Sequence, residues 1–133
     1  IQEIERTLGE KYGKESVATY YGDTKDNLRQ SIVDRFMDAN DPLRFFVGNP
    51  KTGGYGLTLT SSHTVVYYSN DYSLEVRLQS EDRAHRIGQT SKVTYVDLMA
   101  DHTIDEKIVK ALNAKIDLAS QVMGEDPKKI LFG

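Results

Sequence analysis

Two arginines and a glutamine stand at a spacing that can bind an anion. They lie in the segment QSEDRAHRIGQ, which runs from residue 79 to residue 89. On a helix, Gln79, Arg83 and Arg86 share one face because they are four and three positions apart. Arginine suits phosphate because its planar guanidinium stays charged and can bind two oxygens at once. The segment therefore predicts a helical site for a phosphate group.

A plainer interpretation of the same segment is an exposed helix whose arginines form ion pairs with Glu81 and Asp82. Local charge favours the phosphate site, since residues 77–92 contain four basic and two acidic side chains. The whole chain has a net charge of −3, which argues against a basic nucleic-acid-binding domain. Any phosphate binding is therefore expected on a local patch.

A glycine-rich segment is the second candidate for phosphate binding. Residues 49–56 read NPKTGGYG, with three glycines in four positions directly after an apolar run. Glycines allow a sharp turn and let backbone N–H groups approach a phosphate closely. The alternative is a loop that only changes the direction of the chain.

The glycine segment has the outer glycine spacing of a Walker A loop, from Gly48 to Gly53. A Walker A loop then requires lysine followed by serine or threonine, and this chain has Gly54 and Tyr55 there. The glycine segment is therefore not a Walker A loop.

Alternating strands and helices are expected to position both segments. The predicted strands are residues 17–21, 43–47, 63–68 and 93–98. The predicted helices are residues 1–12, a helix capped by Asp23 or Thr24, a helix capped by Ser73, and residues 104–123 with Thr103 and Glu106 as a capping box. This alternation predicts an α/β fold with a parallel sheet flanked by helices, and the run 43–47 reads as a strand buried on both faces.

In such a sheet ligands bind at the carboxyl ends of the strands. The glycine segment and the arginine segment follow neighbouring predicted strands, so we expect both to open on the same edge of the sheet.

Composition limits the other possibilities. The 133 residues fit one domain, predicted over residues 1–123 with a tail at 124–133, and the missing initial methionine suggests a piece of a longer protein. The chain has no cysteine, and its three histidines are far apart, so we expect no metal site. We also expect no membrane contact and a cytoplasmic location, because no apolar run approaches about 18 residues.

The segment 79–89 closely resembles the last helicase motif of the SWI/SNF-type ATPases of helicase superfamily two, Gln-Ala-x-Asp-Arg-Ala-His-Arg-Ile-Gly-Gln. Residues 52–60, reading TGGYGLTLT, resemble the preceding motif of that family, and residues 20–24 resemble an earlier one. The resemblance covers nearly the whole chain. It implies the second RecA-like lobe of a DNA translocase, with ATP and Mg²⁺ held mainly by a first lobe outside this chain.

The resemblance also implies roles for individual residues. Arg83 and Arg86 correspond to arginine fingers that act on the γ-phosphate of ATP, and Gln79 supports them. The residues implied for ATP binding are Gly54, Gly56, Gln79, Arg83 and Arg86. The residues implied for contact with the backbone of double-stranded DNA are Lys51, Thr52, Gly53, Thr58 and Thr60.

Departures from the family pattern favour a bacterial or bacteriophage branch. Residues 69–74 read SNDYSL where eukaryotic remodellers read Asp-x-Asp-Trp-Asn-Pro, and Thr58 replaces the usual asparagine. Two other functions stay open: a noncatalytic module that binds nucleic acid or protein, and a nucleotidyl or glycosyl transferase on a similar sheet. The transferase is disfavoured because no His or carboxylate group is placed for acid–base chemistry.

Overall fold

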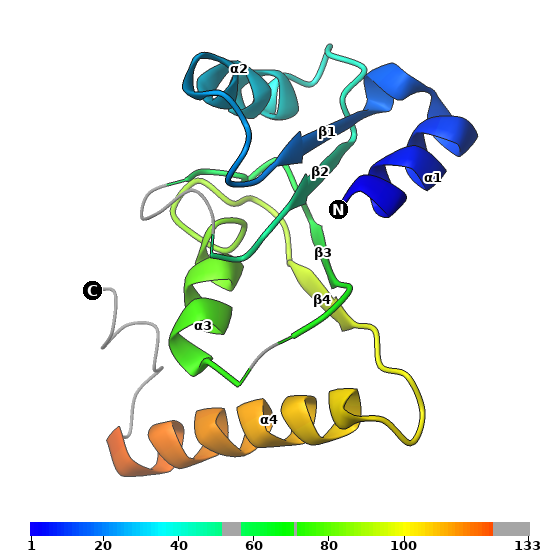
Figure 1. The fold of residues 1–133 in the computed structure, drawn as a ribbon. Helices are drawn as coiled ribbons and strands as arrows, with labels where there is room; N and C mark the ends of the chain where they lie inside the picture. Colours follow the sequence, from blue (N-terminus) through cyan, green and yellow to red (C-terminus); the bar gives the residue numbers. More distant parts are fainter. Residues whose placement is uncertain (52–56, 71, 124–133) are drawn as a thin grey trace. The chain divides into compact units, whose positions relative to one another are not determined.

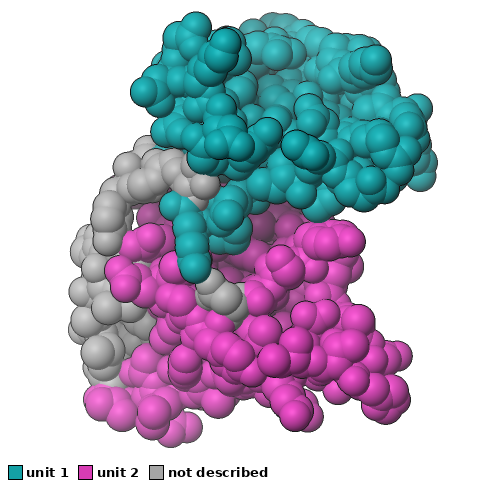
Figure 2. Space-filling model, in the orientation of Figure 1, with its two compact units in different colours: residues 1–61 teal, residues 62–133 magenta. Residues whose placement is uncertain are grey.

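Helices and parallel strands alternate along the chain (Figure 1). The computed structural model describes residues 1–51, 57–70 and 72–123. These residues belong to two compact units, residues 1–61 and residues 62–133 (Figure 2). The predicted boundary between a domain at 1–123 and a tail at 124–133 stays a prediction, because the tail lies outside the described residues.

Unit 1 contains one parallel pair of strands. Its elements are α1 (Gln2–Tyr12), a 3₁₀ turn (Lys14–Ser16), β1 (Val17–Tyr20), α2 (Asp26–Met37) and β2 (Phe45–Gly48). β1 and β2 are parallel, with Val17 opposite Phe45 and Tyr20 opposite Gly48. Parallel neighbours need a crossover between them, and α2 supplies it. The predicted alternation of strand and helix is confirmed here.

Aromatic side chains pack on the strands of unit 1. The ring of Phe46 lies 5.3 Å from that of Tyr20 and 5.5 Å from that of Phe36. On the other side of the pair, Tyr12 contacts Phe45 at 5.1 Å. The prediction of a second strand buried on both faces was wrong, since residues 45–47 are half-buried and Gly48 is exposed.

α2 begins without the side-chain cap that the sequence predicts. Its N-cap residue is Lys25, which makes no capping hydrogen bond. The Thr24 hydroxyl instead accepts the Tyr21 N–H at 3.0 Å and donates to the Thr19 carbonyl at 3.4 Å. Thr24 therefore closes the turn after β1 and is not available to the helix.

Unit 2 also contains one parallel pair of strands, with a shorter crossover helix and a longer final helix than those of unit 1. Its elements are β3 (Thr64–Tyr67), α3 (Leu74–Asp82), β4 (Thr94–Asp97) and α4 (Ile104–Met123). β3 and β4 are parallel, with Thr64 opposite Thr94 and Tyr67 opposite Asp97, and α3 lies on the crossover between them. α3 also contacts α4. The fold class, an α/β arrangement of parallel strands and flanking helices, is therefore as predicted.

α4 has the predicted bounds, and part of its apolar face is buried. Ile108 and Leu112 are buried, while Ile104, in the first turn, is exposed. The predicted capping box is displaced by one residue: Thr103 Oγ1 accepts the Asp105 N–H, and Glu106 accepts the His102 N–H. His102 has a positive φ of 57°, which turns its N–H toward Glu106 and explains the shift.

Candidate phosphate-binding site

The arginine segment does not continue α3 as the sequence predicts. The helix ends at Asp82, Arg83 is its C-cap residue, and Arg86 lies in the turn beyond. Only Gln79 remains on the helix, where its side chain donates to Glu75 at 3.3 Å. The prediction that all three side chains share one helical face was therefore wrong.

The start of α3 is set by a side chain and its end by backbone acceptors. Ser73 Oγ accepts the Val76 N–H at 3.3 Å, so the predicted N-cap is confirmed. At the other end the Glu81 carbonyl accepts the N–H groups of Ala84 and His85, at 3.2 and 3.1 Å. The same carbonyl accepts the Tyr95 hydroxyl at 3.1 Å. Three donors on one carbonyl give the chain a fixed direction as it leaves the helix.

The turn beyond α3 closes on Gln89. Gly88 has a φ of 99°, a conformation that favours glycine, and the Gln89 N–H donates to the Arg86 carbonyl at 3.0 Å. Ala84 is buried at the base of the turn. The two arginines therefore lie on a structured turn whose backbone is held at several points.

Arg83 and Arg86 are both half-buried, whereas the finger interpretation predicts exposed side chains. Each has an interaction within the protein, so neither is without a partner. His85, between them, is exposed. The turn thus carries two guanidiniums three positions apart, and part of the surface of each side chain is accessible to solvent.

A half-buried ionic cluster lies close to this turn in the sequence and was missed by sequence reasoning. Arg77 Nε donates to Glu81 at 2.9 Å, and its two terminal nitrogens donate to both carboxylate oxygens of Asp97. One of these nitrogens also donates to the Asn70 side chain at 2.8 Å. The guanidinium lies 3.6 Å from the centre of the Tyr67 ring. The Arg77, Glu81 and Asp97 side chains are only 10%, 13% and 22% exposed.

The cluster shifts the pKa values of its members. Burial by itself lowers the pKa of Arg77, but hydrogen bonds to Asp97 and Glu81 outweigh it, so the net shift is upward. Burial raises the pKa of Asp97, and the hydrogen bonds from Arg77 and Asn70 reverse that shift and lower it. Burial raises the pKa of Tyr67 to about 12. Arg77 is thus a permanently charged group used inside the fold.

The predicted site residues in unit 1 are only partly described. Thr52, Gly53, Gly54 and Gly56 lie outside the described residues, so the shape of the glycine segment stays a prediction. Lys51 lies in an exposed turn, and its N–H donates to Asn49 at 3.0 Å. Thr58 and Thr60 are half-buried. Whether the glycine and arginine segments open on one edge also stays a prediction, because they belong to different units.

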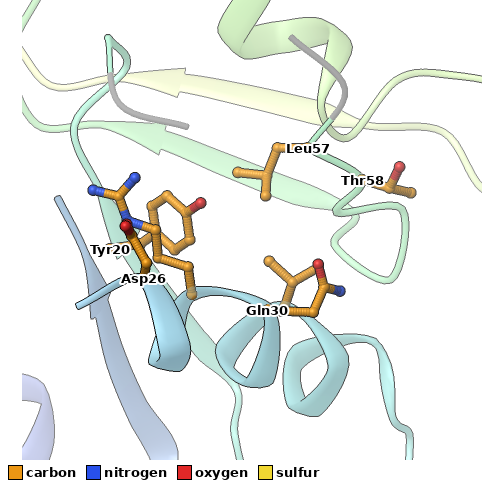
Figure 3. A pocket seen from close by; sticks show the side chains of 7 residues that line it. Tyr20, Asp26, Gln30, Leu57 and Thr58 are labelled. Atoms are coloured by element: carbon orange, nitrogen blue, oxygen red, sulfur yellow. The ribbon is translucent and has the colours of Figure 1, made fainter. Parts of the chain in front are cut away.

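A hollow of about 320 Å³ lies in unit 1, after the carboxyl end of β1 (Figure 3). It is lined by Tyr20, Asp26, Arg29, Gln30, Val33, Leu57 and Thr58. Arg29 uses its donors on the carbonyls of Thr24 and Gly22, at 3.0 and 3.3 Å. Its guanidinium therefore holds the turn after β1. The hollow has one acidic side chain in its lining, Asp26, which lies beside Arg29.

Among residues 1–51, 57–70 and 72–123, no three His, Asp or Glu side chains lie together as metal ligands would. No helix in the same ranges has the length and apolar character to cross a membrane.

Residues 1–88 match the family model of the helicase conserved C-terminal domain. The chain is 38% identical over 111 residues to the ATP-dependent helicase fft2 of Schizosaccharomyces pombe, covering 82% of this chain and 9% of that protein. It is 36% identical over 102 residues to the SWI/SNF-related matrix-associated actin-dependent regulator of chromatin subfamily A member 1 of Mus musculus, covering 77% of this chain and 10% of that protein.

The fold is similar to a crystal structure of the C-terminal part of the Fun30 ATPase domain, with a TM-score of 0.73 and 29% sequence identity. The match covers 84% of this chain and 35% of that one. The chain spans about a tenth of the two curated relatives above. Both are eukaryotic, so the expected bacterial or phage branch finds no support in them.

Proposed function

Because this chain belongs to the family of the helicase conserved C-terminal domain, we propose that it is the second ATPase lobe of a DNA translocase. It is similar to the C-terminal helicase domains of SWI/SNF-type ATPases. In the proposal its arginines act on ATP that a first lobe binds, and opening and closing of the lobes couples hydrolysis to movement.

The observation that carries the proposal is the structured turn after α3. It holds Arg83 and Arg86 three positions apart, on a backbone tied to the end of α3 and to β4 through Tyr95. The family match at residues 1–88 includes both arginines. Two guanidiniums on a fixed backbone suit the negative charge that develops on a transferred phosphoryl group.

The donor set of the described residues fits the anionic end of a nucleotide. Guanidiniums bind phosphate oxygens two at a time, and Gln79, half-buried on the last turns of α3, can add an amide donor. The proposal assigns Mg²⁺ to the first lobe, because the described part of this chain offers no cluster of carboxylates for it. When bound, ATP supplies the phosphoryl group, and this chain's own part is to stabilise charge.

The proposal extends to DNA through the loop after β2. Lys51 is exposed there, and Thr58 and Thr60 are half-buried hydroxyls further along the same loop. We assign them, with Thr52 and Gly53, to contacts with the sugar–phosphate backbone, and Gly54 and Gly56 to the nucleotide. Such contacts carry little sequence information, which suits an enzyme that moves along any DNA.

The test measures DNA-stimulated ATP hydrolysis by this lobe joined to the first lobe that we propose for it. Arg83→Ala and Arg86→Ala should each lower kcat by a factor on the order of 10³ or more. Arg6→Ala is the control, because Arg6 is an arginine whose two ion pairs lie on exposed side chains of α1. Full activity after both substitutions of the turn would refute the finger assignment.

A second measurement separates the proposal from a noncatalytic binding module. If the module interpretation holds, the isolated chain should bind DNA tightly, with a steep dependence on salt and no response to ATP. On the proposed function, the lobe alone should neither hydrolyse ATP nor bind DNA tightly, because its charge is −3 and the first lobe supplies the nucleotide site.

A further inference from the structure

The side chain of Gln89 is bonded on both of its polar groups. Its Nε2 donates to the Ala84 carbonyl at 2.9 Å and to the Ser62 carbonyl at 3.0 Å. Its Oε1 accepts the Ser91 N–H at 3.1 Å. An amide has two N–H donors, so both donors of this half-buried side chain are used.

These bonds close a ring around the arginine turn. Ala84 follows Arg83 directly, and the Gln89 side chain reaches back five residues to its carbonyl. The Gln89 backbone N–H binds the carbonyl of Arg86 itself at 3.0 Å. One residue therefore holds the backbone beside both arginines.

Gln89 also ties the turn to the strands. Ser62 lies two residues before β3, so its bond to Gln89 fixes the turn relative to that strand. At the other end of the turn, the Tyr95 hydroxyl on β4 binds the Glu81 carbonyl. The turn is thus attached close to β3 through Gln89, at its C-terminal end, and to β4 through the Glu81 carbonyl, where it leaves α3.

We propose that Gln89 is a positioning residue that sets where Arg83 and Arg86 meet the nucleotide; this inference rests on the proposed function. A long arginine side chain is placed by the backbone that bears it. A displacement of about 1 Å in a catalytic group can lower a rate by about 10²-fold. Losing the two amide donors frees the turn between residues 84 and 89 without removing either guanidinium.

The experiment uses the intact protein with both lobes and compares Gln89→Glu with Gln121→Glu. Gln89→Glu replaces the two N–H donors of the amide by a carboxylate that faces the carbonyl oxygens of Ser62 and Ala84. Gln121→Glu makes the same chemical change on the exposed surface of α4. We expect Gln89→Glu to lower kcat for DNA-stimulated hydrolysis by about 10–100-fold, with KM for ATP changed by less than about threefold. Gln121→Glu should behave as the unmodified protein.

A transition-state probe distinguishes positioning from general damage. Binding of ADP with aluminium fluoride should weaken by about the same factor as kcat, whereas binding of ADP alone should be unchanged. Gln89→Met, which lacks the donors and adds no charge, should give a smaller loss of the same kind. If ADP binding falls together with kcat in both variants, Gln89 supports the fold in general and the inference is overturned.

The outcomes also separate this inference from the proposed function. If Arg86→Ala abolishes turnover while Gln89→Glu and Gln89→Met keep full kcat, the positioning role is refuted and the finger assignment stands. If Arg83→Ala and Arg86→Ala both keep full kcat, the proposed function itself is refuted, whatever Gln89 does.

Discussion

Removing the charge of Arg77 should destabilise unit 2 strongly. In Arg77→Met the apolar stem is kept, but Asp97 and Glu81 lose their cation while staying mostly buried. Breaking a buried ion pair from one side costs about 3–5 kcal/mol, whereas an exposed pair contributes about 1 kcal/mol or less. The Arg77 and Asp97 side chains are 10% and 22% exposed, so the cost should lie between these two values and nearer the buried one. That is a large share of the roughly 5–15 kcal/mol that stabilises a typical domain.

Hydrogen–deuterium exchange on the intact protein measures this loss locally. Amides of α3 and β4 should exchange faster by a factor on the order of 10²–10³, because each 1.36 kcal/mol is about tenfold. Arg6→Met is the control: its two ion pairs lie on exposed side chains, 58% for Arg6, so no change in the exchange of its helix beyond error is expected. The reasoning is refuted if Arg77→Met accelerates exchange by less than about fivefold.

A double substitution tests the cause. Replacing Asp97 by leucine in the Arg77→Met background removes the stranded carboxylate. The combined change should therefore cost clearly less than the sum of the two single changes. Additive costs would mean that the guanidinium and the carboxylate do not depend on each other.

Two further predictions concern the same unit. The pKa of Asp97 is lower in the folded state than in the unfolded state, where it is about 4. Its contribution to the free energy of unfolding is therefore present above the unfolded pKa and is lost as the pH falls through the folded value. Urea titrations at a series of pH values should show a weaker loss of stability in acid for Asp97→Asn. Gly88→Ala should lower the free energy of unfolding by about 1 kcal/mol or more through backbone strain alone, because φ is 99° and a Cβ there would meet no atom within 4 Å. Gly22 is the control, since a Cβ there is equally free of contacts and φ is not positive. Gly22→Ala should therefore leave the urea midpoint of unfolding unchanged.

Local sequence signals were enough where structure is decided locally. Residues 104–123 form α4 as predicted, and the hydroxyl of Ser73 marks the start of α3. The strand–helix alternation gives the fold class, because parallel neighbours require crossovers.

The end of α3 shows where such signals stop. Nothing between Gln79 and Gly88 breaks a helix by its own propensity, so the pattern runs straight through Asp82. Tyr95 binds the Glu81 carbonyl near the end of the helix, Gln89 binds the Ala84 carbonyl in the turn, and both donors come later in the chain than the helix. The Arg77 cluster was missed for the same reason, since Tyr67 and Asp97 belong to two different strands.

The hydrogen bonds that shape the arginine turn also determine which substitutions it can tolerate. Their acceptors at Ser62, Glu81 and Ala84 are backbone carbonyls, which every amino acid provides. Only the donors, Gln89 and Tyr95, depend on residue identity. In a library of variants, the turn should tolerate most amino acids at positions 62 and 81 and few at positions 89 and 95. Together with the positive φ of Gly88, two side chains that lie outside α3 determine the shape of the turn.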